Sequence, residues 1–253
     1  MSEIMHGTTV ATNTILTGTG ARVGLVTTRG YRQILQIARS FVPGGLGAWV
    51  IYNKSEPMAP LELTIEADER TGADGQIVGD LDEEALLTSL KRLGDEGIEA
   101  LTVCLINSYA NNEHEMRVGA IAAKVLPDIP VSLSSTVIPE MQEYERAVTT
   151  VANSYVRPRV ETYVQRLEKE ISSSMGDVKL NILRSDGGLA SAESAAHLPV
   201  NLLMSGPAGG VAGAAWVAGN AGYKDLLTLD MGGTSTDVSF FTDCKHSFSS
   251  STN

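Results

Sequence analysis

The first 140 residues alternate short apolar runs with segments of helical periodicity. Runs rich in Val, Leu and Ile predict strands, and apolar residues spaced three and four apart predict helices. The predicted strands span residues 22–28, 100–108 and 131–135, and the predicted helices span residues 31–39, 82–93 and 112–126. The run at 100–108 is almost continuously apolar, which is typical of a strand buried on both faces. Strands and helices in alternation predict an α/β layer.

A different pattern covers residues 62–78, where apolar and polar residues alternate on both sides of Asp74-Gly75. Asp-Gly between two alternating runs is a strong turn signal. We therefore expect a β-hairpin over these residues.

The second half of the chain opens on a long helical pattern from residue 145 to 172, which Pro158 should kink or split. We expect strands at 180–184, 200–204 and 226–230, a turn at 185–188, and helices after Ser191 and at 211–222. The predicted organisation is an N-terminal α/β region at 1–140, a second region at 141–241 and a disordered tail at 242–253.

Composition and charge narrow the class of protein and its partners. The chain is 43% hydrophobic and 19% charged, as in globular proteins, with a net charge of −11. A chain with this much negative charge is repelled by phosphate backbones and by anionic membranes. We therefore expect neither nucleic acid nor a membrane as a partner. Pro207 and many glycines interrupt the weakly polar stretch 200–222, which argues against a transmembrane helix. Only two cysteines, Cys104 and Cys244, and no signal-like N-terminus predict a cytoplasmic protein.

The candidate chemistry lies in "LDMGGTSTDVSFF", residues 229–241, where an acid, two glycines, three hydroxyl residues and a second acid separate two apolar runs. Glycines let backbone N–H groups approach a ligand, and successive N–H groups form an anion site. The expected phosphate-binding residues are Asp230, Gly232, Gly233, Thr234, Ser235, Thr236 and Asp237. Asp230 is also the expected Mg²⁺ ligand, since magnesium prefers oxygen ligands and keeps its waters. The alternative is a glycine-rich β-turn whose Asp and Thr serve the turn alone.

The segment "SGPAGGVAGAAWVAG", residues 205–219, comes directly before the strand that carries this turn. Its small residues suit a closely packed core helix. The functional interpretation adds a hinge beside the bound phosphates.

Several stretches together resemble the hydantoinase A / oxoprolinase family. They are "HGTTVATNTIL" (6–16), "GARVGLVTTRGYRQILQIAR" (20–39), "SYANNEHE" (108–115), "SLSSTVIPEMQEYERAVTTVANSYVRP" (132–158), "LRSDGGL" (183–189), "SGPAGGV" (205–211) and "DMGGTSTDVS" (230–239). The resemblance extends in order from residue 6 to about residue 241. The family includes ATP-dependent hydantoinases, oxoprolinases and subunits of acetone and acetophenone carboxylases.

The resemblance implies an α/β fold: part of the actin-like ATPase (ribonuclease-H-like) superfold, with an α/β N-terminal unit. Residues 230–237 then correspond to the second phosphate hairpin of that fold, and residues 205–219 to its first connecting helix. We expect residues 175–241 to form part of a ribonuclease-H-like sheet ending in the hairpin 226–241, whose edge is exposed or covered by a partner. The implied cofactors are ATP and Mg²⁺.

Two departures from the family pattern predict that the chain is a fragment. Family members carry a first phosphate hairpin upstream of "HGTT", whereas this sequence opens "MSEIMHGTT". They also continue beyond the position of Phe241 into an adenosine-binding region. We therefore expect half of the phosphate clamp here, without the purine pocket.

The family reaction, as the resemblance implies it, phosphorylates an unreactive carbonyl with ATP. The expected function is ATP-dependent hydrolysis of a cyclic amide such as a hydantoin or oxoproline. The alternatives are a subunit of an ATP-dependent ketone carboxylase, with acetone or acetophenone as substrate, and a truncated, non-catalytic fragment. The expected partners are the cyclic amide or ketone and either a hydantoinase B-type subunit or further copies of the chain.

Four residues are candidates for catalysis on the substrate side: His6, Thr8, Thr9 and Asp186. The histidine could polarise or deprotonate the substrate, and the threonines could donate hydrogen bonds to it. Thr8 and Thr9 could instead cap a helix over residues 10–16, and Asp186 could instead make a local turn hydrogen bond. The charges at Glu143, Glu145 and Arg146 are interpreted as a solvated helix face.

Overall fold

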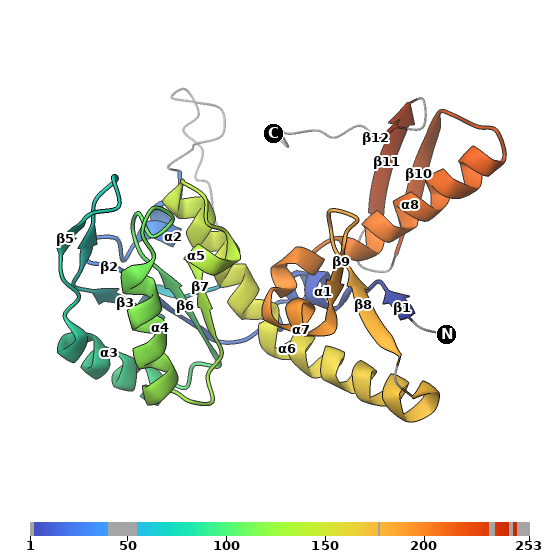
Figure 1. Ribbon diagram of the computed structural model, residues 1–253. Helices are drawn as coiled ribbons and strands as arrows, with labels where there is room; N and C mark the ends of the chain where they lie inside the picture. Colours follow the sequence, from blue (N-terminus) through green and yellow to red (C-terminus); the bar gives the residue numbers. More distant parts are fainter. Residues whose placement is uncertain (1–2, 40–54, 177, 233–235, 243–244, 247–253) are drawn as a thin grey trace, which may run out of the picture. The chain divides into compact units, whose positions relative to one another are not determined.

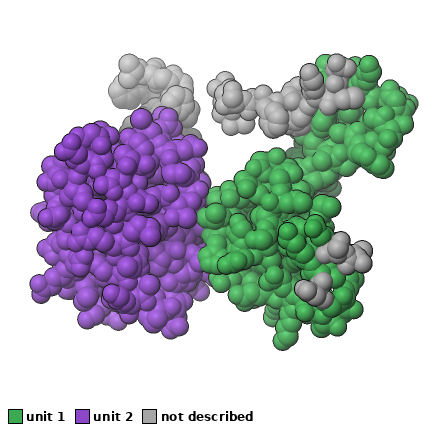
Figure 2. Space-filling view, in the orientation of Figure 1, with its two compact units in different colours: residues 1–18, 160–253 green, residues 19–159 purple. Residues whose placement is uncertain are grey.

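The computed structural model describes residues 3–39, 55–176, 178–232, 236–242 and 245–246. The chain forms two compact units, drawn in different colours in Figure 2. Unit 2 comprises residues 19–159, and unit 1 combines residues 1–18 with residues 160–253. This differs from the sequence division at residue 140, because the N-terminal strand pairs with a strand near residue 180. Gly233, Thr234 and Ser235 and most of the tail 242–253 lie outside the described residues.

Unit 2 is built on a sheet of four parallel strands in the order β3-β2-β6-β7 (Figure 1). The strands are β2 (Val23–Thr28), β3 (Thr64–Ala67), β6 (Ala100–Cys104) and β7 (Val131–Leu133). Every residue of β2 and β6 is buried, as the apolar runs predict for strands covered on both faces.

Helices cover both faces of this sheet. On one face, α3 (Glu83–Asp95) and α4 (Glu113–Val125) pack through residues such as Leu90 and Val118 onto Leu101 and Val103 of β6. On the other face, Ala147 and Val151 of α6 (Glu143–Met175) pack with Val23, Leu25 and Cys104. The sheet is thus the middle layer of an α/β/α sandwich.

The expected hairpin over residues 62–78 is only partly present. Its turn at Asp74-Gly75 is confirmed, but the paired strands are short: β4 (Arg70–Thr71) and β5 (Ile77–Gly79). The first apolar stretch instead supplies the 3₁₀ helix η2 (Leu61–Leu63) and β3 of the main sheet. Pairing with β2 buries Thr64 and Ile65, which a surface hairpin would leave half exposed. The described part of unit 2 also contains two short helices, α2 (Ile34–Ile37) and α5 (Ser134–Val137).

Pro158 does not split the long helix, which runs unbroken from Glu143 to Met175. A proline inside a helix frees carbonyl groups in the preceding turn. Here the Tyr155 carbonyl, three residues earlier, accepts a hydrogen bond of 2.8 Å from the Ala21 N–H. A donor from outside the helix therefore satisfies one carbonyl of the turn that the proline disrupts.

Unit 1 contains a second sheet, in the order β1-β8-β9. Its strands are β1 (Glu3–His6), β8 (Lys179–Leu183) and β9 (Leu189–Ser191), with β1 parallel and β9 antiparallel to β8. Helices α1 (Val10–Leu16) and α7 (Ala192–His197) follow strands of this sheet. The predicted strand at 200–204 is wrong: residues Pro199–Leu202 form the 3₁₀ helix η3. Proline suits the first turn of a helix, and Leu202 is buried there as it would have been in a strand.

The last described elements are α8 (Ser205–Asn220) and a hairpin of β10 (Leu226–Met231) and β11 (Thr236–Thr242), extended by β12 (Lys245–His246). The hairpin is confirmed, but the strands after residue 175 fall into two sheets rather than one. β8 is flanked by β1 and β9 on both edges, so it has no free edge for the hairpin. Within the described residues, β10 pairs with β11 alone, which leaves its other edge open as expected.

Residues Pro199–Asn220 have the length and apolar character of a membrane-crossing helix, and 11% of their most apolar window is buried. They do not form one helix, because Met204 has a φ of 65° between η3 and α8. The 16 residues of α8 fall short of the roughly 20 needed to span a bilayer.

Candidate functional site

The glycine turn lies between two acids that face each other across the hairpin. Asp230 on β10 and Asp237 on β11 are direct cross-strand partners, so their side chains lie on the same face. Gly232 and Thr236 border the turn and are exposed. Of the seven expected phosphate-binding residues, the structure thus describes four.

The face that carries these acids is turned toward α8, which packs against both strands of the hairpin. The Asp230 Oδ2 atom lies 3.8 Å from where a Cβ of Gly210 would be. Phe241, on the same face, is buried. The carboxylates therefore lie next to the N-terminal half of α8.

Glycines allow two further segments to approach the same half of α8. A Cβ at Gly206 would lie 2.7 Å from the Thr9 Cγ2 atom, and one at Gly209 would lie 2.8 Å from the Leu183 Cδ2 atom. Both distances are too short for a real Cβ, so the neighbouring side chains would have to move. The segment "SGPAGG" is thus the common neighbour of "HGTT", "LRSDGG" and Asp230.

Hydrogen bonds fix the contact between α8 and the N-terminal segment. The buried Ser205 hydroxyl donates to the Thr8 carbonyl over 3.0 Å, and the Met204 N–H donates to the Thr12 hydroxyl over 3.0 Å. Sequence reasoning assigned no role to Ser205. Its only sequence signal is its place immediately before Gly-Pro.

Thr8 and Thr9 stand at the start of α1, and their contacts are close to the helix-capping role that was the predicted alternative to catalysis. The buried Thr8 hydroxyl accepts a hydrogen bond of 3.2 Å from the Val10 N–H. Thr9 is the N-cap residue, but its hydroxyl caps no backbone N–H and accepts from the Asn13 side chain instead. Thr9 is exposed, so its hydroxyl remains accessible to a ligand.

His6 ends β1, beside Ile182 of β8, at the carboxyl edge of a parallel strand pair. Its Nε2 atom lies 2.7 Å from the Tyr163 hydroxyl of α6, in a part-buried hydrogen bond. This contact orients the imidazole ring. Tyr163 was missed by sequence reasoning, because the helical spacing of α6 marked it only as a packing residue.

Asp186 makes the local turn hydrogen bonds foreseen as its alternative. Its Oδ1 atom accepts from the Gly188 N–H over 2.9 Å, and its Oδ2 atom accepts from Arg184 over 2.8 Å. Both oxygens are therefore used within the turn that follows β8. This arrangement suits the positioning of Arg184 more than direct proton transfer.

The acids of the hairpin fit a magnesium ion that arrives with a phosphate. Asp230 and Asp237 offer carboxylate oxygens, the donor type that Mg²⁺ prefers. In the part of the chain that the structure describes, no group of three or more acids, histidines or cysteines could hold a metal by itself. Magnesium is commonly held by one or two carboxylates together with phosphate oxygens and waters, so two acids are sufficient.

Unit 2 holds a buried polar network that sequence reasoning did not find. Arg146 was interpreted as part of a solvated face, yet it is fully buried and donates to the Leu105 carbonyl over 2.6 Å. The Glu115 carboxylate, also fully buried, accepts four hydrogen bonds. Burial raises the pKa of the nearby Cys104 thiol to about 11, against the opposing effect of Arg146. A thiol so held in its neutral form is a packing group and not a nucleophile.

Comparisons with known proteins identify the family. Residues 1–126 match the description "Hydantoinase/oxoprolinase N-terminal region", and residues 146–253 match "Hydantoinase/oxoprolinase". The chain is 30% identical to the caprolactamase subunit alpha of Pseudomonas jessenii over 97% of its length and 35% of that protein. It is 35% identical to 5-oxoprolinase 1 of Arabidopsis thaliana over 93% of its length and 20% of that protein.

Solved structures support the same assignment. A nucleotide-free acetone carboxylase structure matches 95% of this chain with a TM-score of 0.85 at 25% identity. The ATP-dependent caprolactamase from Pseudomonas jessenii matches 94% with a TM-score of 0.81 at 30% identity. In both cases this chain covers 35% of the solved chain.

These matches confirm the predicted fold class, an α/β chain with part of the actin-like ATPase fold. The chain spans about a third of the length of these solved relatives and a fifth of the plant oxoprolinase. Residues 1–126 and 146–253 together make up most of the chain and match models of one family, so this chain belongs to the hydantoinase/oxoprolinase family.

Proposed function

We propose that this chain supplies the phosphate-binding hairpin of an ATP-dependent enzyme that hydrolyses a cyclic amide by phosphorylating its carbonyl. The observation that carries the proposal is the convergence on α8. Gly206, Gly209 and Gly210 place Thr9, Leu183 and Asp230 around one half of a single helix. Binding and substrate-side residues would then share one rigid element.

In this proposal the hairpin and the start of α8 together hold the triphosphate. Asp230, with Asp237 beside it, would hold Mg²⁺, and the glycine turn 232–236 would present N–H and hydroxyl donors. The first N–H groups of α8 add the positive end of a helix dipole. Bound MgATP supplies the phosphoryl group that activates the amide carbonyl, a transfer that depends on positioning and charge stabilisation.

The substrate side of the proposed site combines His6 with Thr8 and Thr9. Tyr163 orients the His6 ring through the hydrogen bond of 2.7 Å, so the ring can present its other nitrogen to the substrate. The exposed Thr9 hydroxyl is available as a donor, whereas the buried Thr8 hydroxyl supports the turn into α1. Asp186 would act as a positioning residue, through its ion pair with Arg184.

A second candidate function is ATP-dependent ketone carboxylation. The likeness to acetone carboxylase supports it, as does 31% identity to the acetophenone carboxylase gamma subunit of Aromatoleum aromaticum. Both candidates use the same phosphate hairpin and differ in the acceptor. Either reaction requires the rest of a longer protein or a partner, for which a hydantoinase B-type subunit is our proposal. We place the reaction in the cytoplasm.

The test is substrate-stimulated ATP hydrolysis by the complete enzyme that carries this chain, with its hydantoinase B-type subunit. We expect 5-oxoproline, hydantoin or caprolactam to stimulate hydrolysis. We expect Asp230→Ala to reduce it about 100-fold or more, since charge stabilisation of this kind contributes that much. Asp74→Ala is the control, because Asp74 lies in an exposed turn of unit 2.

Each alternative gives a different result in this assay. Stimulation only by acetone or acetophenone with bicarbonate would favour the carboxylase. No stimulation by any acceptor would favour the non-catalytic alternative. Full activity of the Asp230→Ala variant would contradict the site assignment.

A further inference from the structure

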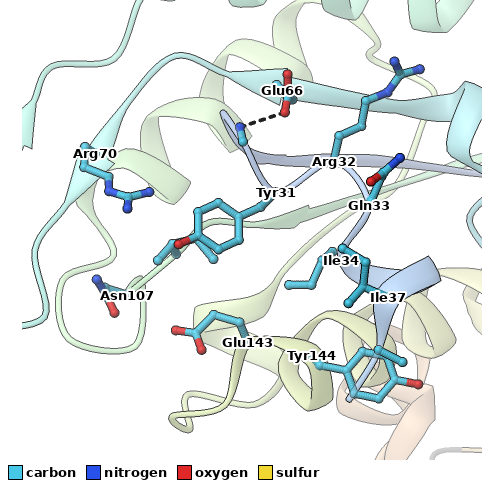
Figure 3. Close-up of a pocket in the computed structure, with 13 residues that line it drawn as sticks. Tyr31, Arg32, Gln33, Ile34, Ile37, Glu66, Arg70, Asn107, Glu143 and Tyr144 are labelled. Atoms are coloured by element: carbon cyan, nitrogen blue, oxygen red, sulfur yellow. Dashed lines mark hydrogen bonds between the residues drawn. The ribbon is translucent and has the colours of Figure 1, made fainter. Parts of the chain in front are cut away.

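Unit 2 contains a pocket whose described lining includes no residue of the hairpin. It has a volume of about 800 Å³, within the range of small-molecule sites, and its lining includes Tyr31, Ile34, Arg70, Asn107 and Glu143 (Figure 3). We call it the switch-point pocket. Every described residue that lines it belongs to unit 2.

The topology of the sheet explains where this pocket lies. From β2 the chain passes to β3 on one side and later to β6 on the other, in the order β3-β2-β6. The segments leaving the carboxyl ends of two strands on opposite sides of such a reversal diverge and leave a crevice between them. Tyr31 follows β2 and Asn107 follows β6, so the pocket occupies this crevice.

The floor of the crevice is braced by buried hydrogen bonds. The Thr28 hydroxyl, at the end of β2, accepts from the Ile106 N–H over 2.9 Å and donates to the Glu69 carboxylate. The other Glu69 oxygen lies 2.8 Å from the buried His114 Nδ1 atom. Such a network holds the ends of the two strands at a fixed separation.

Backbone strain also gathers at this pocket. The described residues contain four non-glycine residues with positive φ. Two of them, Ala38 and Asn107, line the pocket, and a third, Gln142, precedes the lining residue Glu143. Positive φ in such residues is unfavourable and persists where the surrounding structure enforces it, often at ligand sites.

Among the described residues that line the pocket are two arginines and two glutamates, and one of each already has a hydrogen-bond partner. Arg32 donates to the Thr64 and Leu61 carbonyls over 3.0 and 3.1 Å. Glu66 accepts from the Gly30 N–H over 2.8 Å, the dashed line in Figure 3. Arg32 and Glu66 therefore stabilise the loop that follows β2.

The second pair is left for a ligand. Arg70 lies over the Tyr31 ring at 5.4 Å from its centroid and has no ion pair with any described residue. The Glu143 side chain, in the first turn of α6, likewise has no hydrogen bond or ion pair with any described residue. In Figure 3 both charged groups point into the space around the Tyr31 ring.

We propose that the switch-point pocket binds a small zwitterion of the amino acid type. Its carboxylate would pair with Arg70, its ammonium with Glu143, and its carbon chain would lie against Tyr31 and Ile34. The Glu143 carboxylate would repel a ligand that carries only a negative charge, and the Arg70 guanidinium would repel one that carries only a positive charge. A ligand with both charges satisfies both side chains, and the aromatic and aliphatic lining covers its apolar part.

This inference does not depend on the proposed ATP-dependent reaction, because it concerns residues of unit 2 alone. The test uses the 253-residue chain without nucleotide and a series of ω-amino acids: glycine, β-alanine, 4-aminobutanoate and 6-aminohexanoate. Calorimetric titration, with chemical shift mapping, measures the Kd of each. Butanoate and butylamine are the single-charge controls.

We expect at least one member of the series to bind at least 10-fold more tightly than both single-charge controls. Arg70→Gln and Glu143→Gln should each weaken that binding about 10-fold or more. The matched controls Arg117→Gln and Glu83→Gln, an exposed ion pair between α4 and α3, should leave it unchanged. Thermal melting of each variant checks that it is folded.

Three results would overturn the proposal. The first is that no amino acid of the series binds more tightly than butanoate and butylamine. The second is that butanoate binds as tightly as the best zwitterion, which would make this a plain anion site. The third is that binding survives in both the Arg70→Gln and the Glu143→Gln variants.

Discussion

At the scale of single residues, the Glu115 carboxylate is a charged group that the fold buries completely. It is completely buried and accepts hydrogen bonds from the Leu105 and Ser135 N–H groups and from the Ser108 and Ser134 hydroxyls, at 2.6 to 2.9 Å. Charged groups without water are tolerable only when hydrogen bonds replace their hydration. Glu115 thus joins the end of β6 to the end of β7 through one side chain.

We expect Glu115→Gln to lower the free energy of unfolding by about 3 kcal/mol. The amide is nearly isosteric, but its NH₂ group cannot accept the hydrogen bonds that one carboxylate oxygen now receives. Urea unfolding of both proteins measures the difference. The matched control is Glu113→Gln, exposed in the same helical turn, which should change stability by less than about 0.5 kcal/mol. Equal effects at the two positions would contradict this account.

Cys104 gives a pH-dependent prediction at the same scale. Its folded pKa is about 11, above the ordinary thiol value near 8.5 that holds in the unfolded chain. Above that ordinary value the unfolded state releases the proton and the folded state keeps it, so this thiol stabilises the unfolded state as pH rises. We expect it to remove on the order of 3 kcal/mol of stability between about pH 8.5 and 11.

The measurement compares chemical unfolding of the wild type and of Cys104→Ala at several pH values. The variant loses stability at all pH values from the cavity, so the informative quantity is the slope against pH. The wild type should fall more steeply above pH 8.5. Parallel slopes would show that burial does not hold the thiol neutral.

At the scale of elements, the hairpin of β10 and β11 has two unlike faces. The face toward α8 carries Asp230, Asp237 and the buried Phe241. The opposite face carries large apolar side chains that are all more than half exposed: Leu227, Leu229, Met231, Val238 and Phe240. So large an apolar surface beside an open strand edge favours association.

We therefore expect the 253-residue chain, by itself, to self-associate through this face. Leu229 and Val238 are cross-strand partners, so Leu229→Lys with Val238→Glu replaces apolar area by a cross-strand ion pair and keeps the hairpin. Sedimentation velocity over a concentration series should show less association for this double variant. Met116→Lys, at an exposed residue of α4, is the control and should not change it. Association that is insensitive to the double variant would locate the contact elsewhere.

At the scale of the whole molecule, sequence patterns predicted the elements whose environment is uniform and missed those that depend on distant partners. The continuous apolar run of β6 identified a strand buried on both faces. β1 was missed because its four residues show no distinct hydrophobic periodicity. Its pairing partner β8 begins only at Lys179, far along the chain, so the local sequence does not reveal the pairing. The prediction of a strand at 200–204 was wrong because a short apolar run has the same pattern in a strand and in a 3₁₀ helix.

The candidate site was predictable to the extent that it follows local sequence. The glycine hairpin is a local pattern, so both of its strands and its two acids were found. The contacts of α8 with Thr9 and Leu183 join segments about 200 and 26 residues apart, which no spacing rule reveals. The buried Arg146 and Glu115 were missed for a related reason, since a charge run on a helix indicates solvent unless its partners are known.

The division into two units leads to a prediction about folding. Unit 2 is one continuous segment, residues 19–159, whereas unit 1 needs residues 1–18 together with residues 160–253. β1 pairs with β8 in four registered positions, and the Thr8 carbonyl and Thr12 hydroxyl accept hydrogen bonds from Ser205 and Met204. Without residues 1–18, β8 loses its parallel partner and α8 loses both of these contacts.

We therefore expect residues 19–159 alone to unfold cooperatively with dispersed amide NMR signals, because both helical layers of their sheet are retained. Residues 160–253 alone should lack protected amides in β8. Adding a peptide of residues 1–18 should restore protection at Asn181 and Ile182, whose positions pair with Met5 and His6 of β1. A peptide with Ile4→Pro is the matched control, because proline removes a backbone donor from the strand. If residues 160–253 protected β8 equally well without the peptide, the N-terminal strand would not be required to fold unit 1.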